Sequence, residues 1–262
     1  MLKRTTLIAG LVLSAIGFSN TPVKALNHTG NLFVSESYDG SIAEITPNGT
    51  KSTFASGLGI PYGLAFDSSG NLFVSNDEGV GSITEITPNG TKSTFASGLS
   101  YPYGLAFDSS GNLFVSNNGS ITEITPNGTK STFASGLSYP YGLAFDSSGN
   151  LFVDNLGNYS ITEITPNGTK STFASGLNNP YGLAFDSSGN LFVGNLGNYG
   201  ITEITPNGTK STFASGLNNP YGLAFDGQTN SSAVPEPSNL LAVFGGLVSL
   251  GSLRKLKNKR RK

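Results

Sequence analysis

The sequence predicts an all-β protein, a β-propeller of about five four-stranded antiparallel blades. One unit recurs five times, because Gly-Asn-Leu-Phe-Val begins at each of Gly30, Gly70, Gly111, Gly149 and Gly189. Within each copy, short runs of β-branched and aromatic residues are separated by Gly, Asn and Pro, which is typical of strands joined by turns. No part of the repeats shows helical periodicity. A repeat of about 40 residues with four strands matches one propeller blade.

Each copy supplies four expected strands in order. In the second copy they cover residues 63–67, 71–76, 82–87 and 92–97. Asp-Ser-Ser-Gly joins the first two strands, and Pro-Asn-Gly joins the last two. Proline restricts φ while asparagine and glycine accept positive φ, as tight turns require. A glutamate on the third strand and a lysine on the fourth recur in every copy, so we expect a cross-strand ion pair in each blade.

The phase of the repeat predicts how the ring closes. The repeats start with strands two to four (31–58) and finish with a lone first strand (222–226). We expect these terminal strands to pair and complete the fifth blade, which would leave no exposed sheet edge. A partner chain or an open array is the alternative to a closed monomer.

The first 25 residues have the parts of a secretory signal peptide. Lys3 and Arg4 precede an apolar stretch over 7–18, and small residues lead to Ala25. The apolar stretch is short for a membrane span, which needs about 20 residues. We expect cleavage after Ala25 and export of the product; a buried first helix is the alternative.

The last 30 residues, 233–262, differ in composition from the repeats. Pro-Glu-Pro is followed by an apolar run over 240–253, predicted to be a transmembrane helix, and then by seven basic residues. Such a basic cluster holds its end of a helix on the cytoplasmic side. An ordinary single-span tail is one interpretation. The residues expected to take part in sorting and processing are Ala25, Val234, Pro235, Glu236, Pro237, Arg254 and Lys255.

This tail resembles the PEP-CTERM sorting signal of Gram-negative bacteria in the order and length of its parts. The resemblance implies transient anchoring in the inner membrane, recognition by an exosortase after signal peptidase has acted, cleavage near the tripeptide, and release to the cell surface or extracellular matrix. The domains are then a signal peptide (1–25), a propeller (26–232) and a sorting signal (233–262).

The propeller repeats also carry a family resemblance. Pro-Tyr-Gly-Leu-Ala-Phe-Asp, then Gly-Asn-Leu-Phe-Val, then Ile-Thr-Pro-Asn-Gly span residues 30–226 and resemble NHL-repeat and streptogramin-lyase-like propellers. Those families usually have six or seven blades, whereas this sequence supplies five.

The amino-acid composition excludes several classes of function. The chain has no cysteine, which excludes disulfides and thiolate chemistry. Its net charge of −1 hides an acidic propeller, because residues 26–234 contain five basic and fifteen acidic residues and so carry −10. We therefore expect no binding to nucleic acid.

The aromatic residues divide by position. Fifteen of the 17 phenylalanines fall inside the expected strands, where we expect them to fill the core between blades, whereas every tyrosine falls in or beside loops of one face. Tyrosine joins an apolar ring to a polar tip and is enriched where surfaces recognise partners. The alternative for the Pro-Tyr-Gly tyrosines is packing at the ends of strands. The candidate binding residues are Tyr38, Tyr62, Tyr101, Tyr103, Tyr139, Tyr141, Tyr159, Tyr181, Tyr199 and Tyr221.

A second candidate site is the ring where the second strands end. Its carboxylate and amide oxygens suit Ca²⁺ or Mg²⁺, and gluconolactonase-like propellers, which this region resembles in residue types alone, hold a metal in the channel mouth. Asparagines that cap turns are the alternative, and apart from this cation no cofactor is expected. We expect Asp-Ser-Ser-Gly-Asn to form a hairpin turn and not a calcium loop. The candidate metal ligands are Glu36, Asn76, Asn117, Asp154, Asn155 and Asn195.

The residue types in the sequence give little support to an enzymatic function. The lone histidine, His28, precedes the repeats, whereas streptogramin lyases act through a histidine in the propeller. We favour an exported, non-enzymatic module that binds polysaccharide or a surface protein. A metal-dependent lactonase-like or lyase-like enzyme and a purely structural surface protein are the alternatives.

Overall fold

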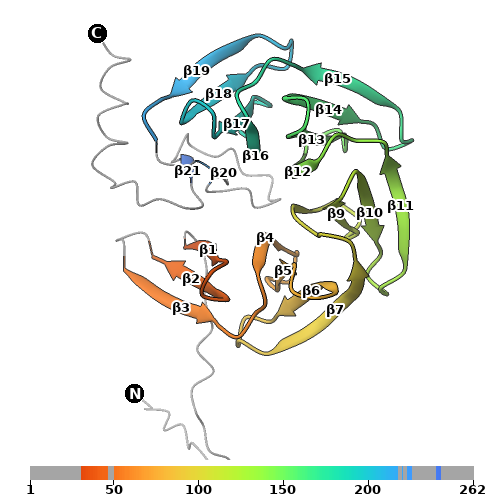
Figure 1. Cartoon of the computed structure of the whole chain (residues 1–262), viewed down its shortest axis with the longest axis vertical. Helices are drawn as coiled ribbons and strands as arrows, with labels where there is room; N and C mark the ends of the chain where they lie inside the picture. The colour runs from red at the N-terminus through yellow and green to blue at the C-terminus, as the bar shows by residue number, and fades with distance from the viewer. Residues whose placement is uncertain (1–30, 47–49, 218–219, 221–222, 226–239, 243–262) are drawn as a thin grey trace, which may run out of the picture.

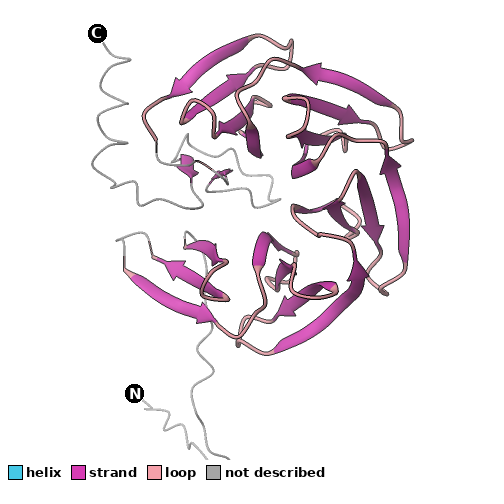
Figure 2. Ribbon diagram, viewed as in Figure 1, coloured by secondary structure: helices cyan, strands magenta, loops and turns pink. Residues whose placement is uncertain are grey.

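The structure is a computed structural model that describes residues 31–46, 50–217, 220, 223–225 and 240–242. It shows a five-blade β-propeller, with sheets arranged around a central axis (Figure 1). The described residues form strands and loops without a helix (Figure 2). The predicted fold class is confirmed.

Strands of each blade follow one another from the axis outward, each antiparallel to the next. Blade 1 has three strands, β1 (Leu32–Glu36), β2 (Ser41–Ile45) and β3 (Lys51–Ala55). Blade 2 consists of β4 (Pro61–Phe66), β5 (Leu72–Asn76), β6 (Gly81–Ile86) and β7 (Lys92–Leu99). Blade 3 consists of β8 (Leu105–Phe107), β9 (Leu113–Asn117), β10 (Ser120–Ile124) and β11 (Lys130–Ser135). Blade 4 consists of β12 (Pro140–Phe145), β13 (Leu151–Asn155), β14 (Ser160–Ile164) and β15 (Lys170–Ala174). Blade 5 consists of β16 (Pro180–Phe185), β17 (Leu191–Asn195), β18 (Gly200–Ile204) and β19 (Lys210–Ala214), and β20 (Leu223–Phe225) and β21 (Leu240–Ala242) follow it.

The Asp-Ser-Ser-Gly-Asn segments are hairpin turns, as predicted. In blade 3, Asp108 Oδ1 accepts hydrogen bonds from the backbone N–H groups of Ser110 (2.9 Å) and Asn112 (2.8 Å). Its Oδ2 accepts a third from Asn112 Nδ2 (2.8 Å). The carboxylate thus ties the turn to itself and is fully occupied within it.

We expect Asp108→Ala to lower the free energy of unfolding by about 1–2 kcal/mol, because three hydrogen bonds to an ionised acceptor are lost. Urea unfolding followed by far-UV circular dichroism measures this change. Ser109→Ala, at an exposed position in the same turn, is the control and should change the free energy by less than about 0.5 kcal/mol. Equal effects of the two substitutions would contradict the role given to the carboxylate.

Phenylalanines fill the space between blades, as predicted. The Phe73 ring of β5 meets Phe95 of its own blade edge-on at a centroid distance of 5.0 Å, and Phe107 of blade 3 at 4.9 Å. Phe73 and Ile83 from blade 2 share one buried cluster with Leu113 from blade 3. From blade 1 to blade 5, each blade is therefore held to the one that follows it in the chain by an apolar layer. Edge-to-face aromatic pairs add about 0.5–1.5 kcal/mol each.

The predicted glutamate–lysine pairs within blades are wrong. In blade 2, Lys92 lies opposite Ile86 while Glu85 lies opposite Ser93, so the two side chains project from opposite faces of the sheet. Lys92 Nζ instead donates to the carbonyl oxygen of Ser56 in the preceding blade. The same contact between blades is made by Lys130, Lys170 and Lys210 to Ser97, Ser135 and Ser175.

The predicted pairing of the terminal strands is also not found. β20 pairs with β21, and in the part of the chain that is described β1 pairs with β2 alone. Leu223 of β20 packs on the Phe192 and Ile201 cluster of blade 5, which places β20 beside that blade (Figure 1). Among the described residues, blade 1 has no inner strand, and Phe66 of β4 in the adjacent blade is 41% exposed.

β21 falls within the segment predicted to be a transmembrane helix. Leu240–Ala242 form a strand there, and the remainder of the segment lies outside the described residues. Among the described residues, no helix is long and apolar enough to cross a membrane.

Candidate functional site

Two kinds of loop lie together on one face of the propeller, which we call the loop face: the loops between the second and third strands of a blade, and the linkers between blades. Backbone hydrogen bonds join them, from Asp77 N–H to the Ile60 carbonyl oxygen (3.1 Å) and from Leu156 N–H to that of Tyr139 (3.0 Å). This is the face on which sequence copies differ. The tyrosines at and beside it separate into two sets with different surroundings.

The first set is exposed. Tyr38 is fully exposed, and the other four members have 50–67% of their surface accessible. These four also adopt left-handed backbone conformations, with φ between 51° and 57°. An L-residue in that region costs about 1 kcal/mol or more relative to right-handed backbone. We call them the strained tyrosines: Tyr101, Tyr139, Tyr159 and Tyr199.

In blades 1 and 3, glycine occupies the place that Tyr159 and Tyr199 have in blades 4 and 5. The carbonyl groups of Tyr159 and Tyr199 accept hydrogen bonds from the leucine N–H that follows the fourth strand, and Gly40 and Gly119 accept the corresponding bond in blades 1 and 3. Both glycines have positive φ, as this backbone demands. The positive φ of Tyr159 and Tyr199 was not predicted, although glycine at the equivalent places of other copies indicates such a backbone.

The second set lines the inner strands. Rings of Tyr62 and Tyr103 meet at a centroid distance of 5.4 Å, Tyr103 and Tyr141 stack at 4.1 Å, and Tyr141 and Tyr181 lie 4.0 Å apart. Burial, followed by the neighbouring Tyr181, raises the pKa of the Tyr141 hydroxyl far above its ordinary value. These four rings therefore form a continuous arc from blade 2 to blade 5. Tyr221 lies outside the described residues.

The glycines after Tyr62, Tyr103 and Tyr141 let adjacent inner strands approach closely. A Cβ on Gly104 would stand 2.1 Å from the carbonyl oxygen of Tyr141 in the next blade. A serine on the second strand uses this approach. Ser116 Oγ accepts a hydrogen bond from Gly104 N–H (2.8 Å) and donates one to the Tyr141 carbonyl (2.6 Å). Ser75 makes the same bridge between blades 2 and 3.

Asp154 takes the place of this serine in blade 4. Its side chain is fully buried, and Oδ1 accepts hydrogen bonds from Gly142 N–H (2.8 Å) and Tyr141 N–H (3.2 Å). Oδ2 is buried without a hydrogen-bond partner, on the side where Gly142 approaches Gly182 of the next blade. Burial raises the pKa of this carboxyl to about 8, against the lowering effect of the two backbone bonds. A neutral carboxyl at pH 7 would present an O–H where Ser116 presents its hydroxyl.

The remaining candidate metal ligands bond within their own blades. Glu36 accepts hydrogen bonds from Ser41 and Lys51, and the Lys51 bond is the main cause that lowers its pKa. The side-chain Nδ2 of every candidate asparagine donates to a valine carbonyl and a threonine hydroxyl of its blade; they are Asn76, Asn117, Asn155 and Asn195.

Alternation along β13 separates Asp154 from Asn155, because successive side chains point to opposite faces. Across the described ranges, no three His, Cys, Asp or Glu side chains gather in a way that could hold a metal ion. The described residues thus offer the predicted cation no converged set of ligands. The predicted sorting and processing residues lie outside them.

Solved structures of other proteins share this fold. No protein-family model and no curated protein sequence matches the chain. Virginiamycin B lyase from Staphylococcus aureus is 22% identical over 75% of this chain and 71% of its own, with a TM-score of 0.62. A streptogramin B lyase is 21% identical over 76% and 70%, also with a TM-score of 0.62. A gluconolactonase from Xanthomonas campestris is 17% identical over 76% of both chains, with a TM-score of 0.69. At these identities the likeness establishes a shared propeller fold.

Proposed function

We propose that this protein is an exported, non-enzymatic binding module whose loop face recognises an extracellular polysaccharide through its exposed tyrosines. The observation that supports this is the strained set, Tyr101, Tyr139, Tyr159 and Tyr199, each exposed and each held at positive φ. A bulky residue at such a position is a strain that a fold retains where the side chain serves another purpose.

The strained tyrosines are held in place by their loops. The Tyr139 carbonyl accepts a hydrogen bond from Leu156 N–H, and a Cβ on Gly157 would lie 2.8 Å from Tyr139 Cδ2. The ring therefore rests on the Gly157 backbone while two thirds of its surface stays exposed. A ring positioned before binding loses little entropy on meeting a ligand.

Charge narrows the class of polymer. Residues 26–234 carry a net charge of −10, so an anionic polymer would be repelled at low ionic strength. An aromatic ring with a hydroxyl at its tip can stack on the apolar face of a sugar and hydrogen-bond to its edge. A neutral polysaccharide fits this surface best.

An enzymatic function has weaker support. The lyase from Staphylococcus aureus has been solved as a catalytically inactive variant in which one histidine is replaced by alanine, whereas the lone histidine of this chain, His28, precedes the repeats. No acidic cluster for a metal is found in the described ranges. Among the described residues, the lactonase or lyase alternative therefore has neither a histidine nor an acidic cluster to support it.

Export is part of the proposal and rests on the two terminal segments of the sequence. Signal peptidase would act after Ala25 and an exosortase near Pro235–Pro237. Intact-mass measurement of the protein recovered from the medium of an exosortase-containing Gram-negative host is expected to show residues 26 to about 235. A cell-bound product with an intact tail would contradict the processing step.

The double substitution Tyr159→Asn with Tyr199→Asn tests the binding function. Asparagine accepts positive φ, as Asn179 does in the linker before blade 5. We expect the free energy of unfolding to rise by about 0.5–2 kcal/mol, while affinity for a neutral polysaccharide falls about tenfold. Affinity electrophoresis in gels containing dextran, galactomannan or hydroxyethyl cellulose measures the second quantity.

Tyr103→Phe, within the stacked arc, is the matched control because it removes a hydroxyl away from the strained set; its affinity should equal that of the wild type. Unchanged affinity of the double variant would exclude these tyrosines as the binding surface. If the wild-type protein binds no polysaccharide, the ligand is a protein or the propeller is purely structural, and the proposal falls.

A further inference from the structure

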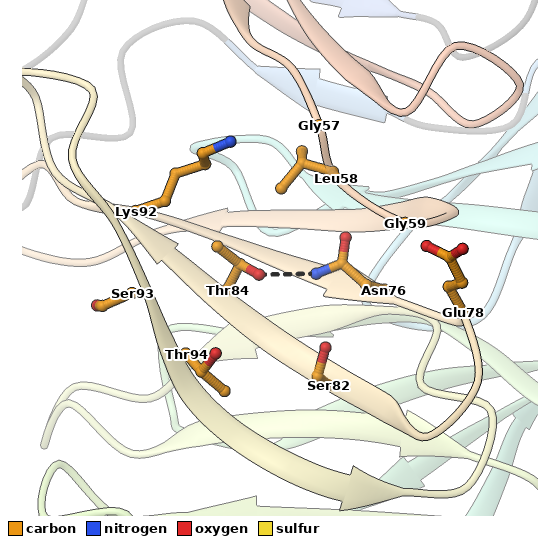
Figure 3. Close-up of a pocket in the computed structure, with 10 residues that line it drawn as sticks. All are labelled: Gly57, Leu58, Gly59, Asn76, Glu78, Ser82, Thr84, Lys92, Ser93 and Thr94. Atoms are coloured by element: carbon orange, nitrogen blue, oxygen red, sulfur yellow. Dashed lines mark hydrogen bonds between the residues drawn. The ribbon is translucent and has the colours of Figure 1, made fainter.

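A polar cavity of about 270 Å³ lies between the linker that joins blades 1 and 2 and the body of blade 2 (Figure 3). Gly57–Gly59 form one wall, and side chains from β5, β6 and β7 form the other. Glu78, from the loop between β5 and β6, lines it, so one end of the cavity reaches the loop face. Its volume is just below the roughly 300–1,000 Å³ of pockets that hold drug-sized molecules.

The Asn76 side chain is fixed in this cavity and keeps one hydrogen-bond acceptor without a partner. It is 5% exposed, and its Nδ2 donates to Thr84 Oγ1 (3.0 Å) and to the Val74 carbonyl (3.2 Å). These two bonds orient the amide and turn Oδ1 away from Thr84 toward the Gly57–Gly59 wall (Figure 3). Oδ1 is buried and has no hydrogen-bond partner, a state that costs about 1–3 kcal/mol.

The corresponding oxygen is used in blades 4 and 5. Asn155 Oδ1 accepts a hydrogen bond from Ser138 N–H (3.3 Å), and Asn195 Oδ1 accepts one from Asn178 N–H (3.2 Å). In blade 2 the linker residue at this place is Gly59, and Glu78 occupies the space beside it, since a Cβ on Gly59 would lie 2.5 Å from Glu78 Cβ. The unpartnered oxygen thus coincides with a local difference in the linker and loop. Asn117 Oδ1 in blade 3 is also unpartnered.

The lining matches a neutral ligand with many hydroxyl groups. Ser82, Thr84 and Thr94 bring hydroxyls that both donate and accept, and one lysine is balanced by one glutamate. The cavity has no aromatic lining residue, so recognition would be by hydrogen bonds instead of stacking.

We propose that this cavity is a subsite for one neutral sugar unit, a hydroxyl of which donates a hydrogen bond to Asn76 Oδ1. The proposal rests on the function proposed above and adds to it a polar contact separate from the strained tyrosines. The polymer would stack on the tyrosines of the loop face, and one unit of it, or its end, would enter between blades 1 and 2.

The test uses D-glucose, D-galactose and N-acetyl-D-glucosamine as probes, with saturation-transfer NMR and titration of amide shifts as readouts. Asn76→Leu removes the acceptor. Asn155→Leu is its control outside the cavity, because it loses the same two bonds within its blade and, in addition, the bond from Ser138 N–H. We expect Asn76→Leu to weaken binding of at least one probe about tenfold or more, and Asn155→Leu to leave it unchanged.

A second pair of variants tests the same subsite if Asn76→Leu does not fold. Thr94→Phe blocks the cavity from an exposed position on β7, and Thr172→Phe makes the equivalent change on β15. Loss of binding in Thr94→Phe alone supports the subsite. Equal behaviour of the two variants, or no binding of any probe by the wild-type protein, overturns it and leaves a water molecule as the partner of Asn76 Oδ1.

The two proposals can fail separately. If Tyr159→Asn with Tyr199→Asn abolishes polysaccharide binding while Asn76→Leu does not change the binding of probes or polymer, the subsite is wrong and the tyrosine surface stands. If probes bind at Asn76 but the tyrosine variant binds polymer as the wild type does, the tyrosine surface is wrong and the subsite stands.

Discussion

Asp154→Asn is expected to leave the stability of the propeller nearly unchanged at or below about pH 4 and to raise it by several kcal/mol at about pH 9. Burial holds the pKa of the Asp154 carboxyl at about 8 in the folded protein, compared with about 4 in an unfolded chain. Between those values the folded state binds a proton that the unfolded state has released. The free energy of unfolding therefore falls as pH rises, by up to about 1.4 kcal/mol per pH unit.

The local contacts explain why asparagine is the appropriate replacement. Its Oδ1 can accept the Gly142 and Tyr141 N–H bonds that Asp154 accepts, and its amide N–H can stand where the protonated carboxyl has its O–H. Asparagine thus copies the neutral acid at every pH. Asp154→Ser, which restores the hydroxyl that Ser75 and Ser116 use for their bridges, should also lose the pH dependence, with a cost for the smaller side chain.

Urea unfolding at a series of pH values gives the free energy of unfolding of the wild type and of Asp154→Asn. The effect is the difference between these two free energies at each pH. This difference cancels contributions from the other shifted carboxyls, since burial raises the pKa of Asp77 and the Lys51 bond lowers that of Glu36 in both proteins. Asp39→Asn, at an exposed site, is the control and should show no such trend. A pH-independent difference between wild type and Asp154→Asn would show that the buried carboxyl is ionised in the folded state.

Ending the chain at residue 217 is expected to lower the free energy of unfolding by several kcal/mol compared with ending it at residue 232. The shorter chain lacks β20, whose Leu223 covers Phe192 and Ile201 of blade 5. Exposing such a layer costs about 25 cal/mol for each Å² of apolar surface. The same comparison reports on ring closure, because both chains lack β21, the strand that β20 pairs with in the structure.

Thermal unfolding of both truncated chains, beside the full chain, provides the measurement. If β20 turns to the open edge of β1 once β21 is absent, the chain ending at 232 will unfold in one cooperative transition and at least as high a temperature as the full chain. Leu223→Ala in the full chain is a milder version, with an expected loss of about 1–3 kcal/mol. Equal stability of the two truncated chains would mean that β20 contributes no packing to blade 5.

Much of the fold could be predicted from the sequence, because its signals are local. In the second repeat the strands expected at 71–76 and 82–87 are found as β5 (Leu72–Asn76) and β6 (Gly81–Ile86). Turn residues act within a few positions of themselves, as the Asp108 carboxylate does. Repetition then extends one correct prediction across the ring.

The candidate site could be predicted only in part. The position of the tyrosines in loops was enough to propose them as binding residues. Their division into a stacked arc and a strained set depends on backbone φ angles and on contacts between blades, which the sequence does not give. The partner of Lys92 was wrongly predicted because strand register decides which face a side chain takes. The turn between β6 and β7 sets Lys92 opposite Ile86 and Ser93 opposite Glu85.

The sequence by itself determined the repeat, the strand order within a blade, the turns and the acidic charge of the propeller, since each follows from residue type and spacing along the chain. Only the tertiary structure decided that Asp154 is buried beside Gly142, that Asn76 keeps an unpartnered oxygen in a cavity, and that β20 pairs with β21 in place of β1. These features arise where two blades, or two distant strands, meet. Contacts of that kind depend on how neighbouring units stack, which residue type and spacing within one repeat do not specify.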